Sequence, residues 1–187
     1  MQELQVKKHE NVLEIGAGSG YMAALLASKA RHVTTIEINP ALKQMAQENL
    51  ANANVTNATV ELGNGSEGST AGAPFDVIMI SGALEVLPEV FLKQLKVGGR
   101  IAAIVGVAPV MQCVVVTRVA ETAWDTVQVF ETNVKALASA PQPSESAPSR
   151  ESGRWQIPSF RARRAAAARV VAILRPRLPT ARPVPAP

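Results

Sequence analysis

Short apolar runs alternate with helix-forming segments along the first half of this chain, and this alternation limits its fold more than any other feature. Apolar runs occupy residues 11–15 (NVLEI), 32–38 (HVTTIEI) and 58–62 (ATVEL). Helical patterns lie between them, over 20–30 and from Pro40 to about residue 53. Strand–helix–strand units of this kind build a largely parallel sheet with helices on its faces. The sequence therefore predicts an α/β fold.

The second half of the alternation begins with a polar, glycine-rich loop over 63–74. The run FDVIMIS (75–81) that follows is almost continuously apolar, which is typical of a central strand covered on both faces. Pro88 then begins a predicted helix over 88–96, because the first turn of a helix tolerates the missing N–H of proline.

The last predicted strands lie between residues 97 and 134. Gly98 and Gly99 are expected to form a turn that leads into a fifth strand within 97–107. Two β-rich runs at 111–121 and 124–134 are separated by a short polar turn, which predicts a closing antiparallel hairpin. The expected architecture is a three-layer, Rossmann-like sheet, mostly parallel, with a C-terminal antiparallel hairpin.

The composition changes abruptly near residue 138. Nine of the thirteen prolines and nine of the twelve arginines follow residue 140, and none of the seven lysines does. Residues 1–140 carry a net charge of −3, whereas residues 141–187 carry +7. We expect a folded domain over 1–137 and a Pro/Arg/Ala-rich, disordered tail over 138–187. A basic helix at 161–174 that binds nucleic acid or a membrane is a less favoured interpretation of this tail than one without an evolved function.

Cysteine content and hydropathy indicate the cellular compartment of the protein. The single cysteine, Cys113, lies in an apolar run and fits a reducing environment. No stretch approaches the roughly 20 apolar residues of a membrane span, and the first ten residues are polar. We therefore expect a cytoplasmic protein that contacts no membrane, and we expect it to be a monomer. No metal site is expected, because histidines and carboxylates do not cluster at ligand spacing.

The segment EIGAGSGY (14–21) is the strongest candidate for a binding site. Gly16, Gly18 and Gly20 follow the first strand, where a ligand can approach the backbone closely and the turn is expected to expose its amides. The dinucleotide fingerprint G-x-G-x-x-G would need glycine at position 21, where this chain has Tyr21. The departure favours a ligand without phosphates.

An acidic residue at the end of the second strand adds to this prediction. Glu37 lies 21 residues after Gly16, where a carboxylate can accept hydrogen bonds from both hydroxyls of a ribose. NAD and S-adenosylmethionine both carry that ribose. Glu14 would place a second carboxylate near the ligand, which suits a sulfonium better than a diphosphate. Asn64 and Gly65, after the third strand, are expected beside the adenine.

The motifs VLEIGAGSGY, TTIEINP, GNGSEG, FDVIMISGALEVLP and QLKVGGRIAAIVG, in this order, resemble the protein-L-isoaspartate O-methyltransferases, a family of class I S-adenosylmethionine-dependent methyltransferases. The resemblance covers about residues 5–137. It implies that the glycine loop lines the methionine half of the cofactor, that Glu37 binds the ribose and that Ile38 packs on the adenine. The loop residues so implied are Glu14, Gly16, Ala17, Gly18, Ser19 and Gly20.

The resemblance also implies the reaction, which is methylation of the free carboxylate of an isoaspartyl residue in a damaged protein or peptide. Such a carboxylate is ionised at neutral pH, so no general base is required. Ser81 and Gly82, at the C-terminal end of the fourth strand, are weak candidates for contact with the reacting groups.

Family members carry a substrate-binding segment before the glycine loop, and only about ten residues precede the first strand here. A cofactor-binding relic without activity is therefore an alternative, and an NAD-dependent oxidoreductase is a less favoured one.

Overall fold

The computed structural model describes residues 2–69 and 71–138. The predicted tail, apart from Ala138, lies outside the described residues, and so does the basic segment at 161–174. No helix within the described part of the chain is both long and apolar enough to cross a membrane.

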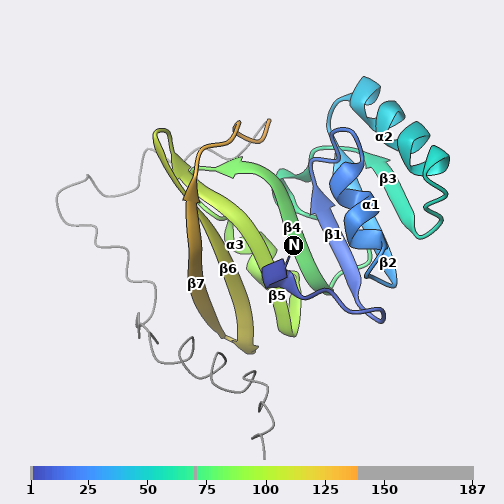
Figure 1. Cartoon of the computed structure of the whole chain (residues 1–187). Coiled ribbons are helices and arrows are strands. Elements are labelled where there is room, and N and C mark those ends of the chain that lie inside the picture. Colours follow the sequence, from blue (N-terminus) through green and yellow to red (C-terminus); the bar gives the residue numbers. More distant parts are fainter. Residues whose placement is uncertain (1, 70, 139–187) are drawn as a thin grey trace, which may run out of the picture. The chain divides into compact units, whose positions relative to one another are not determined.

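Seven strands of the described residues form one sheet, in the order β3-β2-β1-β4-β5-β6-β7 (Figure 1). Strands β1 to β5 pair in parallel, whereas β6 is antiparallel to β5 and β7 is antiparallel to β6. The predicted mostly parallel sheet with a C-terminal hairpin is confirmed. The strands are β1 (Asn11–Ile15), β2 (His32–Glu37), β3 (Ala58–Leu62), β4 (Phe75–Leu84), β5 (Leu95–Val107), β6 (Val110–Ala120) and β7 (Ala123–Thr132).

The helices connect the parallel strands. Helix α1 (Tyr21–Ala27) follows β1, α2 (Pro40–Asn52) follows β2, and α3 (Glu89–Lys93) follows β4. Two 3-10 turns are also present, η1 (Gln2–Leu4) and η2 (Gly65–Glu67). Asn39 caps α2, because its side-chain oxygen accepts from the first amides of the helix and Pro40 occupies the first helical position.

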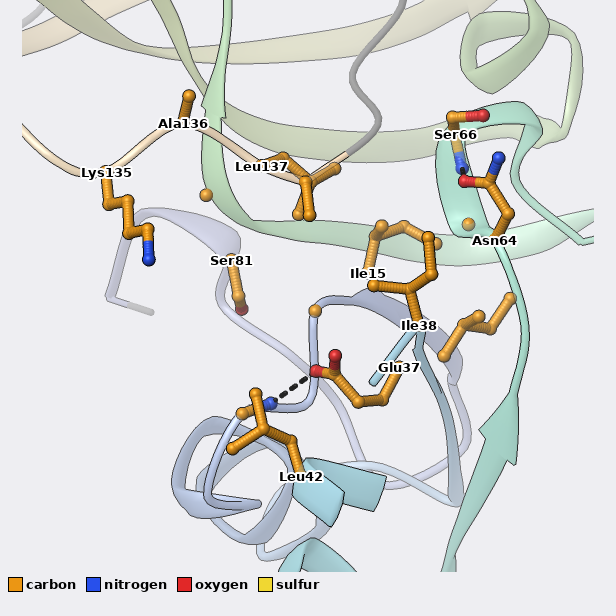
Figure 2. Close-up of a pocket in the computed structure, with 16 residues that line it drawn as sticks. Ile15, Glu37, Ile38, Leu42, Asn64, Ser66, Ser81, Lys135, Ala136 and Leu137 are labelled. Atoms are coloured by element: carbon orange, nitrogen blue, oxygen red, sulfur yellow. Dashed lines mark hydrogen bonds between the residues drawn. The ribbon is translucent and has the colours of Figure 1, made fainter. Parts of the chain in front are cut away.

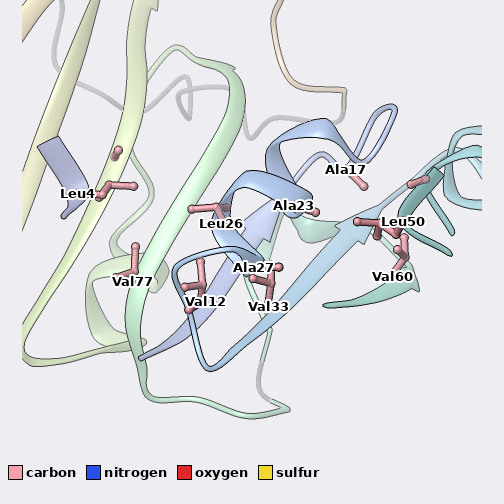
Figure 3. Close-up of a cluster of buried hydrophobic side chains, with 13 residues drawn as sticks. Leu4, Val12, Ala17, Ala23, Leu26, Ala27, Val33, Leu50, Val60 and Val77 are labelled. Carbon is pink, nitrogen blue, oxygen red and sulfur yellow. The ribbon is translucent and has the colours of Figure 1, made fainter. Parts of the chain in front are cut away.

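Two apolar clusters cover the two faces of the sheet. Val12 and its neighbours on β2, β3 and β4 pack against Leu26 of α1 and Leu50 of α2 (Figure 3). Leu13, the next residue of β1, belongs to the other cluster, which includes Phe91 of α3. Successive side chains of a strand point to opposite faces, so α1 and α2 lie on one side of the sheet and α3 on the other. This is the predicted three-layer arrangement.

The predicted turn at Gly98 and Gly99 lies inside β5, as a bulge, and the expectation of a separate turn is wrong. Leu95 pairs with Phe75 and Arg100 with Val77, which leaves the residues between them unpaired across the ladder. Gly98 has a φ of +83°, and a Cβ on Gly99 would lie 2.8 Å from the carbonyl oxygen of Lys96. Glycine is required here because the strand bends within its pairing.

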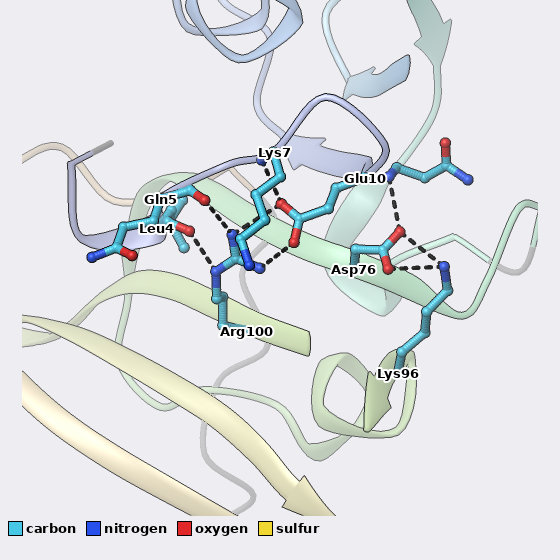
Figure 4. A network of polar contacts seen from close by, with 8 residues as sticks. Leu4, Gln5, Lys7, Glu10, Asp76, Lys96 and Arg100 are labelled. Atoms are coloured by element: carbon cyan, nitrogen blue, oxygen red, sulfur yellow. Dashed lines mark hydrogen bonds and ion pairs between the residues drawn. The ribbon is translucent and has the colours of Figure 1, made fainter. Parts of the chain in front are cut away.

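The amino-terminal segment is tied to β5 through Arg100 (Figure 4). Its guanidinium donates to the backbone oxygens of Leu4 and Gln5 and makes two bonds to the carboxylate of Glu10, at 2.7 and 3.0 Å. Burial alone would raise the pKa of Glu10, but Arg100 and the amide of Lys7 outweigh it and hold this pKa below its ordinary value. These contacts lie at the amino ends of the strands.

Candidate functional site

A pocket of about 280 Å³ lies at the carboxyl ends of the central parallel strands (Figure 2). Its walls include the glycine loop after β1, the end of β2, the loop after β3 and the segment that follows β7. Ligands of open α/β sheets bind at this edge, where the loops of neighbouring strands meet.

The three glycines of the loop have different roles. All have positive φ, at +90°, +53° and +81° for Gly16, Gly18 and Gly20. Gly16 and Gly18 line the pocket, and a Cβ on Gly18 would meet no atom within 4 Å. Gly20 begins α1 instead, and a Cβ there would lie 3.1 Å from the backbone oxygen of Ala46. Gly18 therefore leaves space for a ligand, whereas Gly20 lets α1 approach α2.

The amides of these glycines are already hydrogen-bonded within the protein. The Gly16 amide donates to the oxygen of Ile36 at 2.8 Å, and the Gly20 amide to that of Ala17 at 2.8 Å. The Gly18 amide donates to Oε2 of Glu37 at 2.9 Å. The expectation that this turn exposes its glycine amides to a ligand is therefore wrong. A tight loop satisfies its own donors wherever a neighbouring strand offers an acceptor.

Glu37 ends β2 beside the pocket and is only 6% exposed. Its Oε2 accepts from Gly18, and its Oε1 accepts from the amide of Asn39 at 3.0 Å. Each carboxylate oxygen can accept two hydrogen bonds. Both oxygens therefore keep one acceptor position, and the carboxylate is held in place by backbone on two sides.

Apolar side chains also line the pocket. Ile36, Ile38 and Leu42 line it, and Ile38 is 40% exposed. Asn64 and Gly65 line the pocket as well, but the side-chain oxygen of Asn64 accepts from the Ser66 amide at 3.0 Å and so caps η2. This oxygen is already used once, and the amide NH₂ is the remaining donor of that side chain.

Glu14 is fully buried and does not line the pocket. Its Oε1 accepts from the hydroxyl of Ser81 at 2.8 Å, while its Oε2 has no hydrogen-bond partner. Thr35, its partner across to β2, is also fully buried. Burial raises the pKa of Glu14 to about 7, although Thr35 and Ser81 lower it. Glu14 therefore reaches the pocket only through Ser81.

Six of the ten predicted cofactor residues line the pocket: Gly16, Gly18, Glu37, Ile38, Asn64 and Gly65. The others do not. Glu14 is buried beneath it, Ala17 lies in the core beside α1, Ser19 is exposed and Gly20 packs on α2. The two weak catalytic candidates, Ser81 and Gly82, are in the wall.

Sequence reasoning missed residues 135–138, which also line the pocket after the hairpin. Their sequence, Lys-Ala-Leu-Ala, carries no motif, so only the path of the chain brings them there. Among the described residues, no group of three or more histidine, cysteine or acidic side chains is arranged to hold a metal ion.

The family model for protein-L-isoaspartate(D-aspartate) O-methyltransferase (PCMT) matches residues 1–134. The chain belongs to this family. The predicted resemblance is thereby confirmed. Among PCMT relatives, the protein-L-isoaspartate O-methyltransferase of Methanoculleus marisnigri is 44% identical over 105 residues, which are 56% of this chain and 48% of that protein. That of Herpetosiphon aurantiacus is 44% identical over 113 residues, or 60% of this chain and 50% of that protein. The chain thus spans about half the length of these PCMT relatives.

Solved structures agree on the PCMT fold. A protein-L-isoaspartate O-methyltransferase superposes with a TM-score of 0.66 at 25% identity, over 73% of this chain and 44% of that one. A Plasmodium falciparum chain, named for the same activity and solved with S-adenosyl-L-homocysteine, gives 0.62 at 18% identity over 70% and 66% of the two chains. The second likeness concerns the fold alone.

Proposed function

We propose that this chain binds S-adenosylmethionine in the pocket beside Glu37 and methylates the carboxylate of isoaspartyl residues in proteins or peptides. The observation that carries the proposal is the Glu37 carboxylate, fixed by the Gly18 and Asn39 amides with an acceptor position left on each oxygen. Two acceptors on one rigid carboxylate suit the vicinal hydroxyls of a ribose. Family membership supports the same ligand.

The remaining walls fit this cofactor. The apolar side chains of Ile36, Ile38 and Leu42 offer a surface for a flat base, and the open space at Gly18 leaves room beside the sugar. Lys135 is the one cation among the sixteen described residues that line the pocket. A diphosphate would find no free amide on the three glycines of the loop to donate to its oxygens, because all three amides are already hydrogen-bonded. This argues against the NAD-dependent alternative.

When bound, S-adenosylmethionine supplies a methyl group activated by a sulfonium. The protein's part is to orient and to exclude water, because a peptide α-carboxylate is ionised above a pH of about 4. The Ser81 hydroxyl donates a hydrogen bond to the Glu14 carboxylate and therefore presents its oxygen lone pairs to the pocket. Leu137 and Ile15 place apolar surface there. No residue is needed as a base.

Calorimetry with S-adenosylhomocysteine and a methyl-transfer assay on an isoaspartyl peptide test the proposal together. Glu37→Gln should weaken S-adenosylhomocysteine about 10- to 100-fold, the effect of losing hydrogen bonds to a charged acceptor. Glu61→Gln, at an exposed position of β3, is the matched control. The normal aspartyl peptide controls for substrate, and methanol release reports the methyl ester.

The outcomes separate the alternatives. Cofactor binding with no transfer to the isoaspartyl peptide would favour the cofactor-binding relic. No heat with either S-adenosylmethionine or S-adenosylhomocysteine would defeat both, and displacement of S-adenosylhomocysteine by NAD would favour the oxidoreductase. We also propose a cytoplasmic location, since one cysteine fits a reducing compartment.

A further inference from the structure

The segment after β7 forms one wall of the pocket and is pinned to the sheet. The Ala83 amide donates to the oxygen of Lys135 at 3.1 Å, and the Leu137 amide donates to the oxygen of Ala83 at 2.8 Å. Ala83 and Ala136 thus form a parallel bridge at the carboxyl end of β4. The backbone of Lys135 is therefore held at a fixed place beside the pocket.

Two glycines allow the segment after β7 to pack closely against the glycine loop and β4. A Cβ on Gly16 would lie 3.2 Å from Cδ1 of Leu137, and one on Gly82 would lie 3.1 Å from the Leu137 backbone. Contacts this short leave little room for a side chain at either glycine. The packing of Leu137 over them adds to the hydrogen bonds at Ala83 in positioning Lys135.

The charges that line the pocket are separated. Glu37 is the one anion and Lys135 the one cation among its sixteen described lining residues. In Figure 2 the Lys135 side chain extends from the segment toward the Ser81 side, whereas Ile38 and Asn64 lie on the other side. No ion pair of the described residues includes Lys135. An extended ligand would meet an acceptor at one end and a cation at the other.

Several donors near Lys135 are already in use. The Ser81 hydroxyl donates to the Glu14 carboxylate, and the Ala83 amide donates to the backbone oxygen of Lys135. The amides of Gly16 and Gly18 are hydrogen-bonded to the β2 side of the loop. For an anionic group at this end of the pocket, the Lys135 ammonium is the cationic donor that the described lining residues offer, and it has three N–H donors.

We infer that Lys135 recognises a carboxylate of the ligand at the end of the pocket opposite the ribose site. The inference rests on the proposed function for the identity of that ligand. Two carboxylates qualify by their chemistry, namely that of the amino-acid end of S-adenosylmethionine and the isoaspartyl carboxylate of the peptide. In either position Lys135 binds and orients, and the bond to the methyl group is made by the substrate oxygen.

The test compares ligands with and without a carboxylate. Lys135→Met should weaken S-adenosylhomocysteine about 5-fold at low salt, as expected for a partly exposed ion pair of about 1 kcal/mol. It should leave 5′-methylthioadenosine, which lacks the amino-acid end, unchanged. Lys135→Arg should retain the affinity. Lys93→Met, at a 73% exposed position on α3, controls for loss of one positive charge.

A second arm uses saturating S-adenosylhomocysteine and measures binding of an isoaspartyl peptide and of its α-carboxamide. A loss in Lys135→Met that is confined to the carboxylate form would support the inference with the peptide as the source. Unchanged affinity for both S-adenosylhomocysteine and the isoaspartyl peptide would overturn it. A wild-type chain that binds neither S-adenosylhomocysteine nor 5′-methylthioadenosine would overturn the proposed function as well, which distinguishes the two failures.

Discussion

Replacing Glu14 with glutamine should change how stability depends on pH. Glu14 is fully buried, and burial raises its pKa from the ordinary 4.5 to about 7. The folded protein therefore keeps this proton up to about pH 7, whereas the unfolded chain releases it above about pH 4.5. The folded state binds more protons between these values, so the free energy of unfolding falls as pH rises through that range.

The size of the effect follows from the two pKa values. A difference from 4.5 to about 7 corresponds to about 3 kcal/mol, all of it present at low pH and lost by about pH 8. Glu14→Gln removes the titration and keeps an oxygen that can accept from Ser81. Its amide NH₂ would take the place of the Oε2 atom, which has no partner. We therefore expect near-equal stability at pH 4.5 and an advantage of about 3 kcal/mol for the variant at pH 8.

Urea unfolding of both proteins at several pH values between 4.5 and 8 measures this difference directly. Subtracting the wild-type value cancels the titrating groups that do not interact with Glu14, including Glu10, whose lowered pKa acts below this range. In thermal melts about 3 kcal/mol corresponds to roughly 6 to 12 °C. Glu61→Gln, at an exposed position, controls for the loss of one charge. A difference between Glu14→Gln and wild type that stays constant from pH 5 to 8 would refute the reasoning.

Two other substitutions test the fold. Arg100→Met should lower the free energy of unfolding in urea by about 3 to 5 kcal/mol, because it leaves Glu10 buried without its partner. The double variant with Glu10→Gln should recover part of this loss. A loss below about 1 kcal/mol in Arg100→Met would contradict the prediction. Gly20→Ala should cost more than Gly98→Ala. Both positions have φ near +80°, but only the first Cβ meets another atom, the Ala46 oxygen at 3.1 Å. Equal losses of stability in the two variants would contradict this, because they would mean that the positive φ alone determines the cost of the alanine.

Local sequence signals were sufficient for the parallel half of the sheet. The apolar runs at 11–15 and 58–62 match β1 and β3 residue for residue, and Pro40 begins α2 as predicted. Each of these signals acts within a few residues of the position it determines. Strand β1 is almost wholly buried, which favours apolar side chains, and proline fits the first helical turn because its missing N–H would have no partner there.

Contacts between distant parts of the chain escaped prediction. Leu137 packs on Gly16 and Gly82, and residues 135–138 have no pattern that distinguishes them from a loop. The bulge at Gly98 is a related case, because the glycine pair correctly indicated an unusual backbone but not its place inside β5. A glycine pair specifies a conformation, whereas pairing across the sheet decides whether it is a turn or a bulge.

The glycine loop shows that a regularly spaced motif does not by itself specify the ligand. Gly18 leaves space in the pocket and Gly20 lets two helices pack, so the same residue type meets two unrelated demands. Their amides are bonded within the protein, so the proposed recognition of a ligand relies on side chains from elements that lie far apart in the sequence. Glu37 comes from β2 and Lys135 from the segment after β7. The loop thus helps to shape the pocket, and the residues that we propose distinguish one ligand from another lie outside the loop.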